Sequence, residues 1–363
     1  MTFVKNGVLP DPITEQTDKY FSKSRQALAF NNLNPVVTYR CFMRVDSAII
    51  YKFVEDYLAN ALRGKDYTFK RFFNEGDIAP AKRPLFEIRG RALDLMEHET
   101  VILQKLGWPS LCCYEAQRIV NAVGEQDINI MDMSARHCPG AESVMMASYA
   151  AYVAGFTSCS TDLGGSTFGG SGRGSMPHAF IGAFGSTVEA AVAYARSVPD
   201  ERVIVLVDYY GQELDDAVAC YQALGDKLDS VRIDTHGGRY CQGVTNTESE
   251  GDFAALKRLT EGFGVQYAGR YANYAYGKGV TIEAVYTLRD ALDKAGAYKV
   301  GITVSSGFTP EKVAAFIDCN APVTTIGTGS FLPTDIRDTY ATMDIVAYGD
   351  IKKIKVGREW LLP

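Results

Sequence analysis

The spacing of apolar residues divides the chain into helical and extended segments. In the first third, Ile49, Val54, Leu58 and Leu62 recur at helical spacing, which predicts an amphipathic helix over residues 47–62. Residues 36–45 are rich in strand-forming types and predict a strand. The same reasoning predicts helices over 20–28, 89–107, ending before Pro109, and 114–123. This part of the chain is therefore expected to be mixed α and β structure.

The second half repeats a simpler pattern, in which short apolar runs alternate with helical periodicity. These patterns predict strands over 203–208, 230–234, 299–304 and 323–326, and helices over 214–224, 282–294 and 310–318. Thr309 as N-cap and Pro310 at the first helical position mark the start of the last helix. Largely apolar strands indicate a parallel sheet covered by helices, either open or closed, and we favour a barrel.

A change in composition marks the boundary between two expected domains. Small residues dominate from Ser134 onward, which implies close approaches between backbone segments. We expect an N-terminal α+β domain over 1–125, joined by 341–363, and an α/β barrel over 126–340. An insertion rich in Tyr and Gly lies between 235 and 280, with a helix expected near 253–259. It is a surface excursion, a lid or an oligomer contact.

Composition argues against several classes of function. The 363 residues carry a formal net charge of -6 and no run of Lys or Arg, which argues against a nucleic-acid partner. No apolar run approaches the length of a membrane span, and the first twelve residues lack the features of a secretion signal, so we expect a cytoplasmic protein. The eight cysteines form no CxxC pair, which favours reduced core thiols over a metal site.

Two glycine-containing loops follow successive expected strands and have the chemistry of a phosphate site. They are Ser305-Ser306-Gly307 and Gly327-Thr328-Gly329-Ser330. Because the carboxyl ends of barrel strands face the active site, backbone N–H groups and hydroxyls of both loops can converge on one phosphate. The phosphate-binding residues predicted in this way are Ser306, Gly307, Gly327, Thr328 and Gly329.

Charged residues stand at the ends of two other expected strands. Asp208 and Asp234 close these strands, where a carboxylate can hold ribose hydroxyls or orient magnesium through its water shell. Arg232 lies two residues before Asp234 and on the same face of its strand, so the two can pair, either in a substrate site or as a structural ion pair. His178, considered by itself, is of a type that is usually structural.

Six short motifs stand out in chain order. They are TDKY at 17–20, GSMPH at 174–178, LVDYY at 206–210, VRIDT at 231–235, SSGF at 305–308 and IGTG at 326–329. Together they resemble the nicotinate phosphoribosyltransferase family of type II phosphoribosyltransferases, in which the corresponding motifs read TDxY, GTMPH, LVDTY, VRLDS or VRLDT, SGGL and GVGT. The resemblance covers nearly the whole chain. It implies an irregular, incomplete α/β barrel whose N-terminal domain is completed by the C-terminal segment.

The resemblance also implies roles for individual residues. His178 would accept phosphate from ATP, and Tyr20 would stack on the pyridine ring across a dimer interface. Arg136 matches the second arginine of a motif that holds the pyridine substrate, whereas Ala135 stands where the family has the first. Ser160 falls where relatives specific for nicotinamide carry an aspartate, which favours an acid over an amide substrate.

The implied reaction joins nicotinate to phosphoribosyl pyrophosphate, forming nicotinate mononucleotide and pyrophosphate for NAD biosynthesis. The pyridine nitrogen already carries a lone pair, so stabilisation of the departing charge matters more than a strong base. By resemblance, ATP hydrolysis is coupled through His178, Mg2+ accompanies the pyrophosphate, Asp234 and Asp208 hold the ribose, and Arg232 lies at the substrate. The enzyme would be a homodimer with shared active sites.

Three other interpretations are open at this stage. A transferase for nicotinamide or another base is possible because Ala135 removes one expected anion contact. A non-catalytic paralogue that binds nucleotide would have little reason to keep His178, Asp234 and both phosphate loops. A barrel aldolase or isomerase would need a lysine at a strand end, and none of the expected strands ends in one.

Overall fold

The computed structural model describes residues 13–362, which form two compact units. The first unit contains the residues up to Glu115, the segment Tyr149–Ala154 and the residues from Leu332 onward. The second contains Ala116–Ser148 and Gly155–Phe331. The domain boundaries expected at 125/126 and 340/341 stay predictions. The expectation about a secretion signal concerns residues 1–12, which lie outside the described residues.

The first unit is built on a five-stranded antiparallel sheet in the order β13-β12-β1-β5-β3. The strands are β1 (Val36–Met43), β3 (Tyr67–Arg71), β5 (Phe86–Arg91), β12 (Ala341–Tyr348) and β13 (Ile351–Lys352), with a separate pair β2 (Ser47–Ala48) and β4 (Ile78–Ala79). Cys41 of β1 pairs with Phe86 on one side and with Met343 on the other. The last part of the chain therefore returns to pair with one of its first strands.

Helices surround this sheet and enclose its core. They are α1 (Lys19–Phe30), α2 (Lys52–Ala61), α3 (Ala92–Leu95) and the first part of α4 (Glu99–Val123), with short turns η1 (Ile13–Glu15), η2 (Met96–His98), η8 (Ile336–Thr339) and η9 (Glu359–Leu361). Val54 and Leu58 of α2 pack with Val37 and Tyr39 of β1 in one buried cluster. The helix expected over 47–62 is thus shorter than predicted, because its first residues form β2.

The region after residue 85 differs most from the prediction. Residues 89–91 are not helical but belong to β5, because they pair with β1 and β3. The helices expected over 89–107 and 114–123 are partly replaced by a single helix, α4, which continues through Pro109. The buried residues Leu106, Leu111 and Cys112 flank the proline, and their packing outweighs the missing N–H. Ending the helix at Pro109 was wrong.

The second unit is organised around a six-stranded parallel sheet in the order β7-β6-β11-β10-β9-β8. The strands are β6 (Asn129–Asp132), β7 (Ser158–Cys159), β8 (Val203–Leu206), β9 (Leu228–Ile233), β10 (Gly301–Val304) and β11 (Thr325–Thr328). Every neighbouring pair is parallel, and the sheet curls into part of a barrel. The prediction of a mixed α/β fold with a parallel sheet is confirmed.

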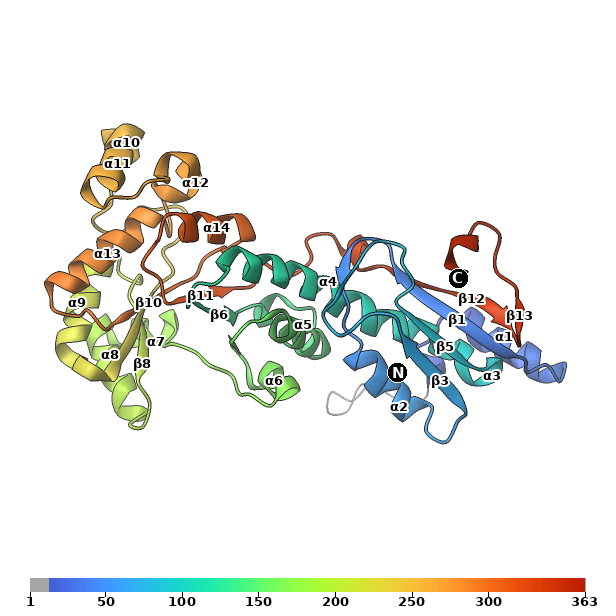
Figure 1. Cartoon of the computed structure of the whole chain (residues 1–363). Helices are drawn as coiled ribbons and strands as arrows, with labels where there is room; N and C mark the ends of the chain where they lie inside the picture. Colours follow the sequence, from blue (N-terminus) through green and yellow to red (C-terminus); the bar gives the residue numbers. More distant parts are fainter. Residues whose placement is uncertain (1–12, 363) are drawn as a thin grey trace. The chain divides into compact units, whose positions relative to one another are not determined.

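Helices cover the sheet between successive strands (Figure 1). They are η3 (Ala135–His137), α5 (Ala141–Ala154), α6 (Asp162–Gly165), η4 (Ser166–Phe168), α7 (His178–Phe184), α8 (Thr187–Ser197), α9 (Glu213–Leu224), η5 (Gly225–Lys227), α13 (Ile282–Lys294) and α14 (Pro310–Asp318). The helices predicted over 214–224, 282–294 and 310–318 are confirmed. Thr309 caps α14 by accepting the N–H of Lys312, as its sequence predicted. No helix among residues 13–362 is long and apolar enough to cross a membrane.

The insertion between 235 and 280 folds against the second unit. It contains α10 (Thr247–Glu250), α11 (Asp252–Lys257), the π-helical turn η6 (Arg258–Gly262), η7 (Ala268–Tyr271) and α12 (Ala272–Ala275). Arg239 pairs with the fully buried Glu213 of α9 at 2.5 Å. Arg258 pairs with the fully buried Glu283 of α13 at 3.3 Å. Two ion pairs thus join the insertion to the helices of the barrel. Its role as a lid or an oligomer contact stays a prediction.

Candidate active site

The carboxyl edge of the parallel sheet collects the chemically active side chains. Because all six strands run in the same direction, the residues that follow them lie along one edge. Asp208 follows β8, Asp234 follows β9, Ser305 follows β10 and Gly329 follows β11. These four strands are adjacent in the sheet, so the second unit brings together most of the residues predicted from the sequence.

Arg232 ends on this edge, and each of the three nitrogens of its guanidinium donates one hydrogen bond. Its Nε donates to Ser305 Oγ at 3.0 Å, its Nη1 to Ser175 Oγ at 3.1 Å and its Nη2 to Asp234 Oδ2 at 2.9 Å. Ser305 Oγ in turn donates to Asp234 Oδ1 at 2.8 Å. The ion pair predicted between Arg232 and Asp234 is therefore present. The same contacts join β9, the end of β10 and the segment that leads into α7.

His178 and Asp208 form a second pair. His178 begins α7, and its Nε2 lies 3.2 Å from both carboxyl oxygens of Asp208. Burial raises the pKa of Asp208, and the contact with His178 partly offsets this shift. No residue between 13 and 362 hydrogen-bonds to Nδ1 of the half-exposed imidazole. The carboxyl group thus orients the ring while leaving its second nitrogen open to a ligand.

The two predicted phosphate loops lie side by side and expose backbone N–H groups. Ser306 and Gly307 both have positive φ values, 81° and 68°. Within the described part of the chain, the N–H groups of Ser306, Gly307, Phe308 and Gly329 have no hydrogen-bond partner. Successive N–H groups in such a turn form a concave site for an anion. This geometry supports the prediction of a phosphate cradle and adds Phe308 to it.

The Thr328 side chain makes contacts between the two loops, and its predicted contact with phosphate stays a prediction. Its buried hydroxyl donates to the Phe308 carbonyl at 2.8 Å and accepts the N–H of Ser330 at 2.9 Å. The side chain therefore ties the two loops together. Gly327 lies inside β11, where a Cβ would come within 2.5 Å of Met133 Sδ. A Cβ at Gly327 would thus displace the flexible end of the Met133 side chain, and contact of Gly327 with phosphate stays a prediction.

Lys312 is a candidate that sequence reasoning missed. The side chain is 9% exposed, and its Nζ donates to the Ser306 carbonyl at 3.0 Å and lies 4.3 Å from the centre of the Phe308 ring. Burial lowers the pKa of Lys312 to about 8, and the charge of Asp234 opposes that shift. Lys312 lies four residues before Phe316, on the apolar face of the helix predicted over 310–318. A lysine on an apolar face was the signal by which the sequence could have indicated it.

Asp132, also missed, closes β6 and is almost completely buried. Its carboxylate accepts the Ser134 N–H at 2.7 Å and the Ser148 hydroxyl at 2.6 Å, which fixes the loop that follows. The run INIMD at 128–132 is apolar and ends in an acid, like the run at 203–208, so the sequence contained the signal. Asp132 supports the site without facing it.

Arg136 and Ser160 lie on loops at the same edge. Arg136 is exposed in η3, and its guanidinium has no partner among residues 13–362. Ser160 is exposed after β7, and its N–H donates to the Asp132 carbonyl at 2.9 Å. Both side chains are free to meet a ligand, and their predicted contacts with the pyridine substrate stay predictions.

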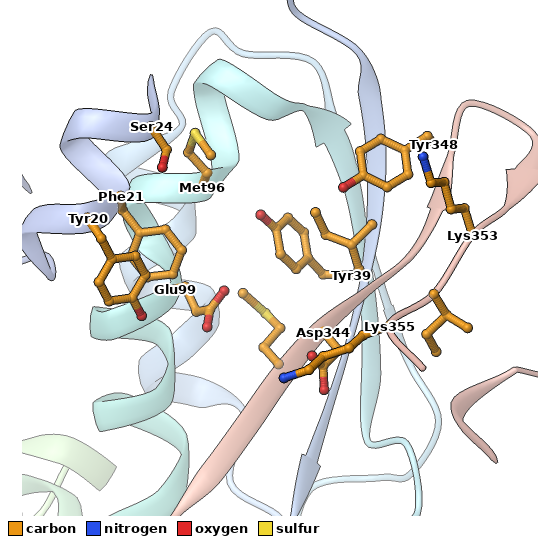
Figure 2. A pocket seen from close by; sticks show the side chains of 13 residues that line it. Tyr20, Phe21, Ser24, Tyr39, Met96, Glu99, Asp344, Tyr348, Lys353 and Lys355 are labelled. Carbon is orange, nitrogen blue, oxygen red and sulfur yellow. The ribbon is translucent and has the colours of Figure 1, made fainter. Parts of the chain in front are cut away.

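Tyr20 lies in the first unit and lines a cavity of about 530 Å³ there (Figure 2). Its ring is 59% exposed. Glu99 lies between Tyr20 and Tyr39 in this view. Burial, with the nearby charges of Asp344 and Asp18, raises the pKa of Glu99 to about 7. The exposure of Tyr20 leaves it available to a second molecule.

No group of three or more His, Cys, Asp or Glu side chains suited to a metal ion occurs among the described residues. All eight cysteines are free thiols. Any magnesium at the carboxyl edge would therefore need oxygen ligands from a bound phosphate in addition to Asp208 and Asp234.

Comparison with solved structures defines the class of fold. The chain is similar to the nicotinate-nucleotide pyrophosphorylase of Pyrococcus furiosus, with a TM-score of 0.73, 24% identity and coverage of 98% of this chain and 81% of the other. Human nicotinic acid phosphoribosyltransferase follows with a TM-score of 0.65, 18% identity and coverage of 94% and 76%. The fold is thus similar to the folds of these two enzymes, with a parallel sheet that curls into part of a barrel.

Sequence comparison finds relatives that are all named nicotinate phosphoribosyltransferases. The chain is 25% identical over 262 residues to a nicotinate phosphoribosyltransferase of Mycobacterium tuberculosis, covering 71% of this chain and 46% of the relative. It is 31% identical over 118 residues to the nicotinate phosphoribosyltransferase of Caenorhabditis elegans, covering 32% and 21%. No family model matches. The relatives confirm the resemblance to the nicotinate phosphoribosyltransferase family. The chain spans about half the length of the first relative.

Lys312 provides a test of the phosphate cradle. Above a pH of about 8 its ammonium loses its proton, so affinity for phosphoribosyl pyrophosphate should fall between pH 7.5 and 9.5, where the phosphate is already fully charged. Lys312→Met should bind roughly tenfold more weakly at pH 7.5 and show little further loss at higher pH. Calorimetric titration at each pH measures both effects.

The matched control is Lys299→Met, which removes an exposed lysine of the same unit and should behave as the unmodified protein. Unchanged affinity and an unchanged pH profile in Lys312→Met would remove this lysine from the binding site.

Proposed function

We propose that this protein transfers the phosphoribosyl group of phosphoribosyl pyrophosphate to nicotinate, as part of NAD biosynthesis. The observation that carries the proposal is the group of unpaired N–H donors at Ser306, Gly307, Phe308 and Gly329, beside a carboxylate on the next strand. A 5'-phosphate would bind these donors, and Asp234 would hold the ribose. The relationship to nicotinate phosphoribosyltransferases supports the same reaction.

In this reaction the protein has two main tasks, which are to position the substrates and to stabilise the charge that develops. The lone pair of the pyridine nitrogen forms the new bond to C1 of the ribose, and the bond from C1 to the pyrophosphate oxygen breaks with its electrons going to pyrophosphate. No proton needs to be removed. Positive charge gathers on the ribose and negative charge on the leaving group as the bond breaks. Asp234 would stabilise the first, and Lys312 would contribute to binding the phosphate.

Magnesium is proposed to arrive with phosphoribosyl pyrophosphate and to neutralise the leaving group when bound. Asp234 and Asp208 offer the oxygen donors that Mg2+ prefers, on neighbouring strands. Both carboxylates already have hydrogen-bond partners, so contact through the water shell of the ion suits them better than direct coordination.

Turnover with different bases tests the proposal. Release of pyrophosphate should require phosphoribosyl pyrophosphate together with nicotinate. Nicotinamide should react at least tenfold more slowly because it lacks the carboxylate that an arginine binds, and quinolinate because its second carboxylate lies beside the reacting nitrogen. Coupled detection of pyrophosphate measures all three bases in parallel.

Preference for nicotinamide or quinolinate would replace nicotinate as the substrate while keeping the reaction. Binding of phosphoribosyl pyrophosphate without turnover on any base would instead favour a non-catalytic paralogue. An Asp234→Asn variant is the control for pyrophosphate released without transfer.

His178 is proposed to accept a phosphoryl group from ATP and so to couple ATP hydrolysis to transfer. The contact with Asp208 leaves Nδ1 of the imidazole open, which suits nucleophilic attack on the γ-phosphorus with ADP as leaving group. Added phosphate would bring strong acceptor oxygens to the carboxyl edge and could order exposed side chains there.

Substitution of His178 tests whether ATP hydrolysis can be removed while phosphoribosyl transfer remains. His178→Asn should lose ATP hydrolysis and any stimulation by ATP, while slow transfer persists at saturating phosphoribosyl pyrophosphate because the phosphate loops remain. Phosphate release and nucleotide formation are measured together with and without ATP. His236→Asn, an exposed histidine on the following strand end, is the matched control. Hydrolysis of ATP by His178→Asn in step with product formation would return the residue to a structural role.

We further propose a homodimer in which Tyr20 of one subunit completes the site of the other. The exposed ring of Tyr20 and its origin in the first unit support this arrangement. Tyr20→Ala and Asp234→Asn should each be inactive alone. After mixing and subunit exchange, up to about a quarter of the wild-type sites should regain activity, because hybrid dimers contain one intact site. Exchange without recovered turnover would mean that each subunit has its own complete site.

A further inference from the structure

A cavity of about 300 Å³ lies inside the second unit. Its walls come from the inner face of the sheet and from the segment that leads into α7. The lining residues are Asn129, Met131, Met133, Thr157, Ser158, Arg173, Gly174, Ser175, Ile204, Asp229, Arg232, Thr303 and Thr325. Three of these residues are charged: Arg173, Arg232 and Asp229.

Two of the three charged groups are already satisfied. Arg232 uses all three of its nitrogens on Ser305, Ser175 and Asp234. The carboxylate of Asp229 pairs with Arg202 at 2.7 Å. Neither group has a free charge to offer a ligand in the cavity.

Arg173 differs from both. Its backbone N–H donates to the Cys159 carbonyl at 2.8 Å, next to the bridge between Cys159 and Gly172, so the backbone beside β7 is held in place. Its guanidinium, however, has no hydrogen bond or ion pair with any residue between 13 and 362. The cavity therefore has one uncompensated positive charge on a fixed stretch of backbone.

The remaining walls suit a flat ring. Met131, Met133 and Ile204 provide apolar surface, and the hydroxyls of Thr157 and Ser158 can orient a polar substituent. A planar guanidinium binds a carboxylate through two parallel hydrogen bonds, which an amide cannot match in charge. A cavity that combines three apolar side chains, several hydroxyl groups and one free guanidinium therefore fits an aromatic carboxylate better than its amide.

We propose that Arg173 recognises the carboxylate of the aromatic acid substrate and sets the preference for acid over amide. This inference rests on the proposed transfer to a pyridine base. Arg173 is thus a specificity-determining residue.

Substitution of Arg173 tests the assignment by kinetics and by binding. In Arg173→Gln the KM for nicotinate should rise roughly 10- to 100-fold, the range expected for one charge-assisted pair, while kcat and the KM for phosphoribosyl pyrophosphate change little. The ratio of kcat/KM for nicotinate over nicotinamide should fall by a similar factor. Arg173→Lys should recover part of the loss because it restores charge without the planar fork.

Arg196→Gln is the matched control, since this exposed arginine lies on α8 and away from the cavity lining. Arg136→Gln is measured beside it. A large loss of nicotinate preference in Arg136→Gln with none in Arg173→Gln would overturn the proposal and assign the carboxylate to Arg136.

Calorimetric binding of nicotinate and nicotinamide, without turnover, keeps this test separate from the proposed function. If the unmodified protein transfers to no base, the proposed function fails, but weaker nicotinate binding in Arg173→Gln still supports the role of Arg173. Equal binding of nicotinate by both proteins, or by neither, would refute it whatever the enzyme assay shows.

Discussion

The guanidinium of Arg232 is the contact on which the arrangement of the candidate site depends. It joins Asp234 on its own strand, Ser305 at the start of a phosphate loop and Ser175 in the segment before His178. Because only 15% of the Arg232 side chain is exposed, its charge depends on these partners, and the same contacts fix where three segments meet. The histidine pair and the phosphate loops are positioned by the same group.

The parts of the fold that the sequence predicted are those determined by near neighbours. The cap at Thr309, the loop after Val304 and the acids after β8 and β9 each depend on residues a few positions away. Their meeting at one edge then follows from the parallel direction of the strands, which the apolar runs already indicated. This is why the phosphate loops and the pair formed by Arg232 with Asp234 were available from the sequence.

What the sequence did not reveal depends on distant partners. The helix through Pro109 survives because buried neighbours outweigh a local preference. Lys312 is a candidate only because its ammonium donates to the Ser306 carbonyl in the folded structure. Arg173 is a candidate only because the other charges in the cavity are already paired. Gly327 was interpreted from its loop, whereas the atoms nearest to it belong to Met133, which follows β6. Such facts require the packed structure.

The pairing of Cys41 with Met343 has a consequence for how the chain is made. A ribosome releases β1 long before β12, with roughly three hundred residues and, at about 5–20 residues per second, some 15–60 s between them. All strands of the parallel sheet emerge within that interval. During translation the central strand of the first sheet thus has one open edge, which is a site for mispairing with other nascent chains. Pairing with β12 closes this edge.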